Sequence, residues 1–154
     1  MKSASLVNGP IPGLVERTPD VMTVNGRVTP AQPLARRCLL VVEDDPIIRS
    51  ALRWGLELHG YGVAAASNGR KALEAVARMV PDLIVLDLAL PGVSGQRVVE
   101  ELTRNGLRPR LRIVVVSAHP DGHEQARAIG ADGHLRKPLN LATLVREIER
   151  ALGN

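Results

Sequence analysis

The sequence predicts an α/β fold in which helices cover both faces of a doubly wound, five-stranded parallel sheet, a three-layer sandwich. From Cys38 onward, short apolar segments alternate with longer stretches in which apolar residues recur at helical spacing. Five such strand–helix units need crossover connections, and these place helices on both faces of a parallel sheet. The 154 residues suffice for one compact domain of this kind.

The predicted strands are short, and the fourth is rich in valine, as expected for a strand buried on both faces. They comprise residues 38–42, 63–66, 83–86, 113–116 and 133–136. The predicted helices comprise residues 46–58, 68–79, 95–104, 121–129 and 141–152. Pro46 suits the first turn of the first helix, and a glycine follows three of the helices where a left-handed cap is needed, at positions 60, 106 and 130.

Residues 1–37 have a different character and are expected to form an irregular or partly disordered N-terminal extension to a domain at 38–154. Five of the eleven prolines fall in this segment, a density that favours irregular chain. Within it, the apolar segments 21–24 and 27–29 flank Asn25-Gly26, which is typical of a two-residue hairpin with a type I′ turn.

Composition excludes several functions. The chain has no Phe, one Trp and one Tyr, too few aromatic residues for a surface that stacks RNA bases. Of the 20 basic and 16 acidic residues, five basic and two acidic residues precede position 38, so the rest is nearly neutral and direct nucleic-acid binding is not expected. The one basic cluster, at positions 104, 108, 110 and 112, is interpreted as solvated surface, with an acidic partner or phosphate as the alternative.

The sequence also predicts a cytoplasmic location. A single cysteine, Cys38, excludes an internal disulfide and suits a reducing compartment. No apolar stretch approaches the roughly 18 residues of a membrane span, and no signal-peptide pattern begins the chain. We therefore expect no membrane contact.

Polar side chains follow four of the predicted strands. Because ligands bind outside the carboxyl ends of the strands in such sheets, these side chains are the candidate site; they are Glu43, Asp44, Asp45, Asp87, Ser117 and Lys137. Crowded carboxylates need protons or a cation, and a cluster of oxygen ligands without cysteine favours Mg²⁺. An aspartate nucleophile, a metal, a hydroxyl and an ammonium are the parts needed for phosphoryl transfer to Asp87.

The same motifs, in order, resemble the CheY-like receiver domains of response regulators over residues 38–154. They are Val41-Val42-Glu43-Asp44-Asp45-Pro46, the segment from Asp87-Leu88-Ala89-Leu90-Pro91-Gly92 to Gly95, Ser117-Ala118, Gly130-Ala131-Asp132 and Lys137-Pro138. The resemblance implies a flavodoxin-like strand order, 2-1-3-4-5. It also implies a cis peptide bond before Pro138.

The resemblance also implies roles for the site residues. Asp87 is the phosphoacceptor and a metal ligand, Asp44 is a direct ligand, and Glu43 acts on the metal mainly through water. The carbonyl of Ala89 is a further ligand, while Ser117 and Lys137 hold the phosphoryl oxygens. Asp45 is an adjacent surface acid.

Two departures bear on the predicted switch. His134 stands where many family members carry a Tyr or Phe whose ring moves with the Ser117 position. The stretch from Ser117 to Lys137 is shorter than in common DNA-binding members, so the helix at 121–129 is expected to be short or displaced. By resemblance, Ala89 and His119 sit at positions that tune the phosphoryl lifetime. The histidines at 59, 119, 123 and 134 show no metal-ligand spacing and are expected in turns or on the surface.

These observations predict a stand-alone, single-domain response regulator of a two-component system or phosphorelay, because the sequence ends at Gly153-Asn154 without an output domain. The implied partners are a histidine kinase or histidine phosphotransfer protein and an unknown downstream protein, with a homodimer through the fourth helix, fifth strand and fifth helix. No enzymatic activity beyond the chain's own phosphorylation and dephosphorylation is expected.

Two alternatives stay open. The first is a metal-dependent phosphatase with an aspartyl nucleophile, although those enzymes carry a second aspartate where Ala89 stands here. The second is a protein-binding module that uses the same fold without phosphorylation, through its N-terminal extension or its arginine cluster.

Overall fold

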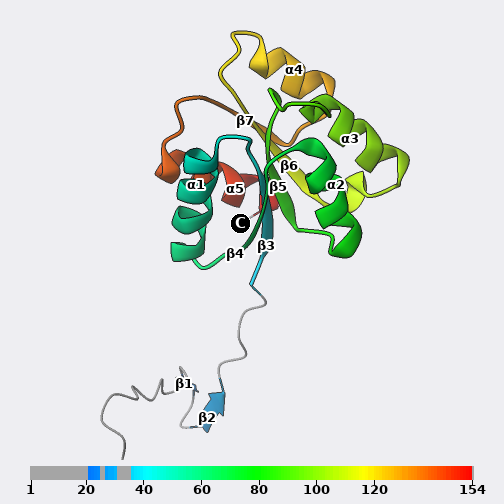
Figure 1. Cartoon of the computed structure of the whole chain (residues 1–154). Coiled ribbons are helices and arrows are strands. Elements are labelled where there is room, and N and C mark those ends of the chain that lie inside the picture. Colours follow the sequence, from blue (N-terminus) through cyan, green and yellow to red (C-terminus); the bar gives the residue numbers. More distant parts are fainter. Residues whose placement is uncertain (1–20, 25–26, 31–35, 154) are drawn as a thin grey trace, which may run out of the picture. The chain divides into compact units, whose positions relative to one another are not determined.

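The computed structural model describes residues 21–24, 27–30 and 36–153 (Figure 1). The chain divides into two units, Met1–Ala35 and Arg36–Asn154. In the first unit, β1 (Val21–Val24) pairs with β2 (Arg27–Pro30) in antiparallel register, with Val24 opposite Arg27. The strand pair of the predicted hairpin is therefore confirmed. Its turn at 25–26 and most of the predicted irregular extension lie outside the described residues.

The second unit contains a five-stranded parallel sheet in the order β4-β3-β5-β6-β7. The first strand of this unit thus lies between the second and the third, and the predicted order 2-1-3-4-5 and flavodoxin-like fold are confirmed. The strands are β3 (Cys38–Val42), β4 (Gly62–Ala66), β5 (Leu83–Asp87), β6 (Arg112–Ser117) and β7 (Gly133–Arg136).

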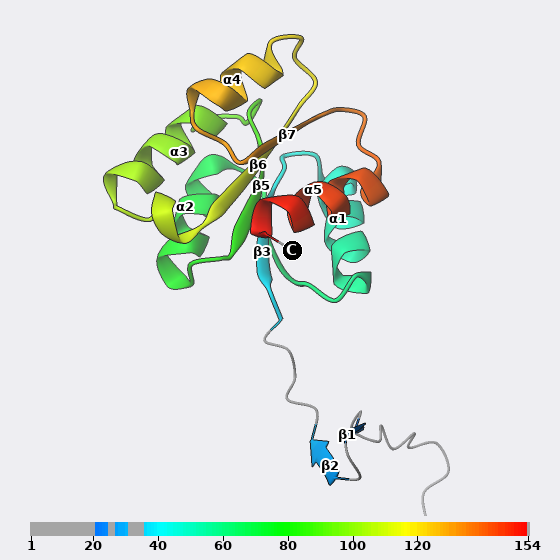
Figure 2. The same ribbon diagram turned by 180° about the vertical axis from the view of Figure 1, so that it is seen from behind.

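Five α-helices cover the two faces of this sheet (Figures 1 and 2). They are α1 (Pro46–Leu58), α2 (Gly69–Arg78), α3 (Gly95–Arg104), α4 (Gly122–Ala128) and α5 (Leu141–Leu152), and a short 3₁₀ turn, η1 (Arg108–Arg110), precedes β6. α1 and α5 pack on one face, and α2, α3 and α4 on the other.

Alternation along the central strands builds both cores. In β3, Leu39 and Val41 face α1 and α5, whereas Leu40 and Val42 face α2, α3 and α4. Every residue of β5 is buried. Leu, Val, Ile and Ala fill both cores without any fully buried aromatic ring, and Tyr61 packs, partly buried, against the core under α1 and α5.

Three of the predicted helices have the predicted bounds, and two are shorter. Asn68 lies outside α2 because its side chain caps the helix, accepting a hydrogen bond from the Lys71 backbone N–H at 2.9 Å. Met79 is already in extended conformation. The glycines at 60, 106 and 130 have φ values of 89°, 69° and 67°, which confirms the predicted left-handed caps.

The expectation of a short fourth helix is confirmed, since α4 has 7 residues. Asp121 at its N-terminus makes no side-chain hydrogen bond to the helix. None of the helices in the described part of the chain has the length and apolar character needed to cross a membrane.

Candidate phosphoryl-transfer site

Four strands bring the predicted site residues to one edge of the sheet. Glu43 and Asp44 follow β3, Asp87 is the last residue of β5, Ser117 is the last residue of β6, and Lys137 follows β7. These strands are parallel neighbours, so their carboxyl ends lie side by side. The sequence placed Asp87 one position after a strand, whereas the ladder includes it opposite Val116.

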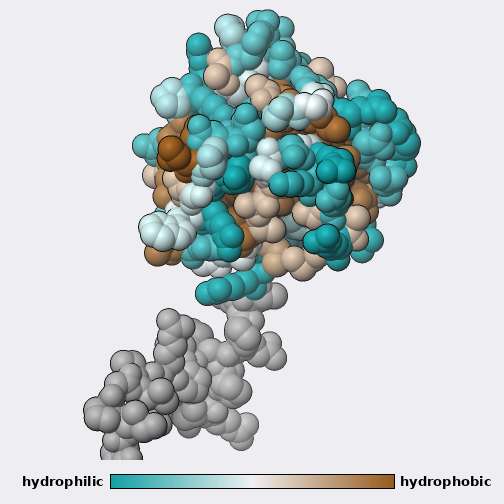
Figure 3. Space-filling model, viewed as in Figure 1, coloured by the Kyte–Doolittle hydropathy of each residue, from teal (hydrophilic) through white to brown (hydrophobic). Residues whose placement is uncertain are grey.

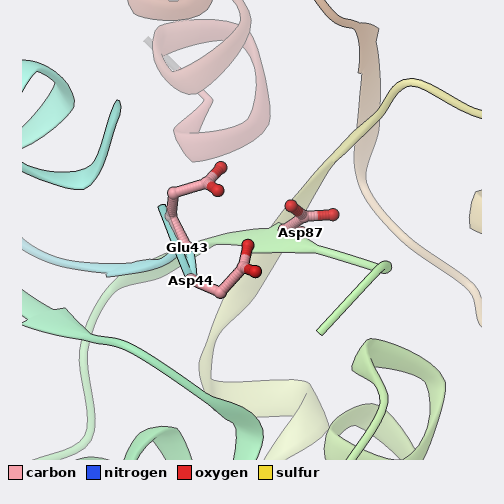
Figure 4. A group of neighbouring side chains, drawn as sticks. All are labelled: Glu43, Asp44 and Asp87. Atoms are coloured by element: carbon pink, nitrogen blue, oxygen red, sulfur yellow. The ribbon is translucent and has the colours of Figure 1, made fainter. Parts of the chain in front are cut away.

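Three carboxylates form the centre of this edge (Figure 4). One oxygen each from Glu43, Asp44 and Asp87 lies within 4.8 Å of the others. Glu43 and Asp87 are only 1 % and 3 % exposed, whereas Asp44 is exposed. Two buried carboxylates this close repel each other unless positive charge lies between them.

Lys137 supplies that charge. Its Nζ donates to Oε2 of Glu43 at 2.8 Å and to Oδ2 of Asp87 at 2.7 Å. Although burial opposes the ammonium charge, the bonds to Asp87 and Glu43 raise the pKa of Lys137. Burial raises the pKa of Glu43, and the hydrogen bond from Lys137 only partly offsets it. Lys137 therefore stays charged and couples the two acids.

The backbone holds the other oxygen of Asp87. The Ala89 N–H donates to Oδ1 at 2.8 Å, so both carboxylate oxygens are fixed and each keeps a free lone pair. Ser117 is buried, and its Oγ accepts from the His119 N–H at 3.1 Å. The Lys137 N–H donates to the Ser117 carbonyl at 3.0 Å, which ties the end of β7 to β6. The peptide bond between Lys137 and Pro138 is cis, as expected.

Asp45 and Arg49 hold the loop that carries the acids. The Asp45 carboxylate accepts from the backbone N–H groups of Ile47 at 2.8 Å and Ile48 at 3.0 Å, and these bonds, led by the one from Ile48, lower its pKa. Asp45 is therefore the cap of α1. The Arg49 side chain donates to the carbonyl oxygens of Glu43 at 2.8 Å and Asp44 at 3.0 Å.

The role of Arg49 was not predicted from the sequence. A basic residue one turn into the helix was the available signal, because side chains on a helix lean toward its N-terminus. Such a residue can reach the backbone of the preceding loop.

The donor set fits a hard divalent cation. Among the described residues, the acidic trio is the only group of three or more metal-binding side chains that come together. All its ligand atoms are oxygens, which suit Mg²⁺ better than a softer metal. The four histidines do not add a second cluster within residues 36–153.

His134 lies in the middle of β7, opposite Val115 of β6, and its ring is partly buried. The ring packs edge-on against that of His123 of α4, with centroids 5.7 Å apart. The expectation that these histidines lie in turns or on the surface is therefore wrong for His134, because a strand position turns its ring toward α4.

Three of the four arginines of the basic cluster form ion pairs in the described part of the chain. Arg104 pairs with Glu101 at 2.7 Å, and Arg108 and Arg112 both pair with Asp132 at 3.2 Å. Arg108 also donates to the Gly130 carbonyl. Arg108 and Arg112 thus connect η1 and β6 to the segment before β7 through one shared carboxylate.

The described residues define a class of protein: an α/β protein with a flavodoxin-like sheet whose carboxyl edge carries an acidic trio and a lysine that bridges two of its members. Comparison with known proteins narrows that class. The family model of the response regulator receiver domain matches residues 39–149. The chain belongs to this family, the receiver domains of two-component systems.

Curated relatives agree with this assignment. The chain is 37 % identical over 118 residues to the transcriptional regulatory protein KdpE of Mycobacterium tuberculosis, which covers 74 % of the chain and 50 % of KdpE. It is 38 % identical over 116 residues to the response regulator MprA of Mycobacterium leprae, again covering 74 % and 50 %. The chain thus spans about half the length of these relatives.

Solved structures agree as well. The chemotaxis protein CheY4 of Vibrio cholerae superposes with a TM-score of 0.71 at 28 % identity, over 76 % of the chain and 99 % of CheY4.

Proposed function

We propose that the chain is a phosphorylation-controlled switch, in which Asp87 accepts a phosphoryl group in a Mg²⁺-dependent reaction. The observation that carries the proposal is the position of Asp87, buried between Lys137 and two further carboxylates at the end of the central strand. A structural aspartate needs no such set. Glu43, Asp44, Asp87 and the carbonyl of Ala89 would hold the ion, with Glu43 acting mainly through water.

The transfer balances as a displacement at phosphorus. A carboxylate oxygen of Asp87 forms a P–O bond while the P–N bond of a phosphohistidine donor breaks, and the departing imidazole nitrogen takes up a proton. When bound, the ion supplies positive charge to the phosphoryl oxygens. Lys137 stays bonded to the site as an ammonium donor, and the Ser117 hydroxyl is one strand away to take another oxygen.

The donor is proposed to be a histidine kinase or a histidine phosphotransfer protein. α1 offers a docking surface for it, because Ile47, Trp54 and Leu58 are 79 %, 77 % and 87 % exposed. With Ala51, which is also exposed, they form one stripe along the helix. Figure 3 shows hydrophobic residues on the exposed side of α1.

The stripe continues into an apolar hollow beside the site. Ile48, Ala118, Pro138 and Leu139 line this hollow, and it reaches Lys137. A helical partner lying on α1 would therefore meet the edge of the sheet that carries Asp87.

The output is proposed to be a changed protein-binding surface at α4, β7 and α5, where a homodimer is also proposed. The relatives named above are a transcriptional regulatory protein and a response regulator, which supports an output through further domains or partners. A stand-alone mode of action, a cytoplasmic location and the absence of other catalysis stay predictions.

The test is to incubate the purified chain with a small-molecule phosphoryl donor, with and without Mg²⁺, and to record its intact mass. We expect one phosphoryl adduct that needs Mg²⁺ and is absent in Asp87→Asn. Asp82→Asn is the matched control, since this aspartate lies at the opposite end of β5 and binds the Cys38 N–H instead.

Absence of the adduct, where another receiver domain reacts, would favour a binding module that works without phosphorylation. Continuous release of phosphate from excess donor at a steady, fast rate would instead favour a phosphatase.

A further inference from the structure

Within residues 36–153, one buried side-chain nitrogen or oxygen lacks a hydrogen-bond partner, and it is Nε2 of His134. The phosphoryl-transfer chemistry does not use this atom. A buried polar atom without a partner costs free energy, and in a native fold it calls for an explanation.

The surroundings of this nitrogen are tight on one side. A Cβ placed on Gly122, the first residue of α4, would lie 2.9 Å from Nε2 of His134 and 3.0 Å from Oγ of Ser117. The imidazole and the Ser117 hydroxyl therefore contact the same point of α4 from two neighbouring strands. Only a glycine leaves room for both.

The other side of the ring is open and charged. A pocket of about 220 Å³ adjoins His134. The titratable and charged groups around it are His123 and Arg127 on α4, Glu147 and Arg150 on α5, and Asp132 before β7. Arg150 bonds both Glu147 and the Asp132 carbonyl at 2.6 Å, and Arg108 and Arg112 neutralise the Asp132 carboxylate. Glu147 also pairs with Arg150, but it is the acid whose charge acts on the His134 ring.

Protonation of the His134 ring changes which of its two surroundings is more favourable, the contact with Gly122 or the pocket beside Glu147. A neutral imidazole can leave Nε2 without a proton, which fits a dry contact with Gly122. The imidazolium carries N–H groups on both nitrogens, so the inward position would bury a charged donor with no acceptor. An outward position would place that donor near Glu147.

We propose that His134 is a proton-controlled switch for α4, in which the neutral ring packs inward against Gly122 and the charged ring turns outward toward Glu147. The Asp121 side chain does not cap α4, and the beginning of the helix is held by hydrogen bonds from the Gly122 N–H to the His119 carbonyl and from the Asp121 N–H to Nδ1 of His119, both at 3.1 Å. In the proposed switch this first turn follows the ring. The surface of α4 and β7 thereby changes with pH in the unphosphorylated chain.

The electrostatic surroundings agree with this arrangement. Burial lowers the pKa of His134, with a further contribution from His123, and Glu147 only partly opposes it. A lowered pKa means that the folded, ring-inward state binds fewer protons than an ordinary histidine does. That state is favoured above an ordinary histidine pKa of about 6.5 and is lost as the pH falls through the lowered value.

The test is an NMR titration of the full chain from about pH 8 to about pH 5, the range in which histidines change charge. The imidazole signals give the midpoint of each histidine. We expect the midpoint of His134 to lie below the ordinary histidine value of about 6.5, with the backbone amide signals of Ser117 and Gly122 moving at the same midpoint.

Four variants test whether the His134 ring is responsible. His134→Phe keeps a ring without a proton and should abolish the movement of the Ser117 and Gly122 signals. His119→Gln and His123→Gln are matched controls and should leave it in place. Gly122→Ala occupies the inward space, so His134 should be outward at every pH and should titrate with a higher midpoint.

The proposal is overturned if the Ser117 and Gly122 signals follow the midpoint of His119 or His123, or if their movement persists in His134→Phe. A midpoint of His134 at or above the ordinary histidine value of about 6.5 would overturn it as well. None of these results depends on phosphorylation, so the proposed function can fail separately.

A second experiment rests on the proposed function and asks whether phosphorylation of Asp87 changes the titration midpoint of His134. If the Ser117 hydroxyl moves to a phosphoryl group on Asp87, the contact of His134 with Gly122 changes, and linkage requires the His134 midpoint to move as well. An unchanged midpoint in a fully phosphorylated chain would leave the acid-driven switch intact but disconnect it from Asp87.

Discussion

The site around Asp87 and the neighbouring region around His134 and α4 are built in opposite ways. At Asp87, both carboxylate oxygens accept hydrogen bonds, one from Lys137 and one from the Ala89 backbone. At α4, the His134 ring has a nitrogen without a partner, and the 7-residue α4 begins without a side-chain cap. The Asp87 carboxylate is therefore held by groups that are already in place. The region around His134 and α4 lacks the partner for this nitrogen and the side-chain cap, and it is the part that we expect to respond.

Of the substitutions considered, removal of Lys137 from the Asp87 site should have the largest effect on the free energy of unfolding. Lys137→Met leaves the buried carboxylates of Glu43 and Asp87 facing each other, so without metal the free energy of unfolding should fall by about 3 kcal/mol. Urea unfolding with and without Mg²⁺ measures this. Mg²⁺ should stabilise the variant more than the parent chain, and an equal effect on both would break the comparison.

Two glycine substitutions compare the two regions directly. A Cβ on Gly95 would lie 2.7 Å from the Asp87 carbonyl and 2.8 Å from Cα of Leu88, which are backbone atoms that cannot move aside. Gly95→Ala should therefore cost about 2 kcal/mol in the free energy of unfolding. In Gly122→Ala the new Cβ would lie 2.9 Å from Nε2 of His134, which can turn away, and 2.9 Å from Cβ of Ser117, which can shift only with its strand, so the cost should be about 1 kcal/mol. Equal costs would mean that α4 is as tightly held as the loop after β5.

The helix caps provide a smaller contrast. Asp45 bonds two backbone N–H groups at the start of α1, whereas Asp121 bonds none at the start of α4. Asp45→Ala should lower the melting temperature by a few degrees, and Asp121→Ala should leave it unchanged. Thermal unfolding followed by circular dichroism decides, and a loss in Asp121→Ala would contradict the description of α4 as uncapped.

Asp44 should affect the metal and not the fold. Its side chain is exposed and makes no hydrogen bond in the described part of the chain, so Asp44→Asn should change the free energy of unfolding without metal by no more than about 0.5 kcal/mol. Mg²⁺ affinity, measured by calorimetry, should fall roughly tenfold or more. Unchanged affinity would remove Asp44 from the proposed ligands.

The region around Asp87 was predicted well, because the apolar pattern of the strands and their parallel arrangement together place its residues. Alternating apolar segments located every strand of the sheet to within a residue, and parallel strands must bring Glu43, Asp87, Ser117 and Lys137 to one edge. The hydrogen bonds from Lys137 to both acids and from the Ala89 N–H to Asp87 are seen only in the structure, since spacing along the chain does not fix which atoms meet.

The region around His134 and α4 was predicted only in outline. A short fourth helix was expected from the length between Ser117 and Lys137, and His134 was recognised as unusual. The tight contact of Gly122 with two strands could not be read from the sequence, because it depends on how α4 crosses β6 and β7. The role of Arg49 was missed because its acceptors are backbone carbonyls, and its position one turn into α1 was the one signal for it in the sequence.

The most direct test of the central claim is to compare backbone amide NMR signals of the chain in Mg²⁺ before and after phosphorylation by a small-molecule donor. We expect signals to change at Asp87 and also at Ser117, Gly122 and His134, while signals of the buried middle of β3 and β5 stay in place. Changes confined to the immediate neighbours of Asp87 would contradict the account, because the phosphoryl group would then be bound without reaching the α4 surface.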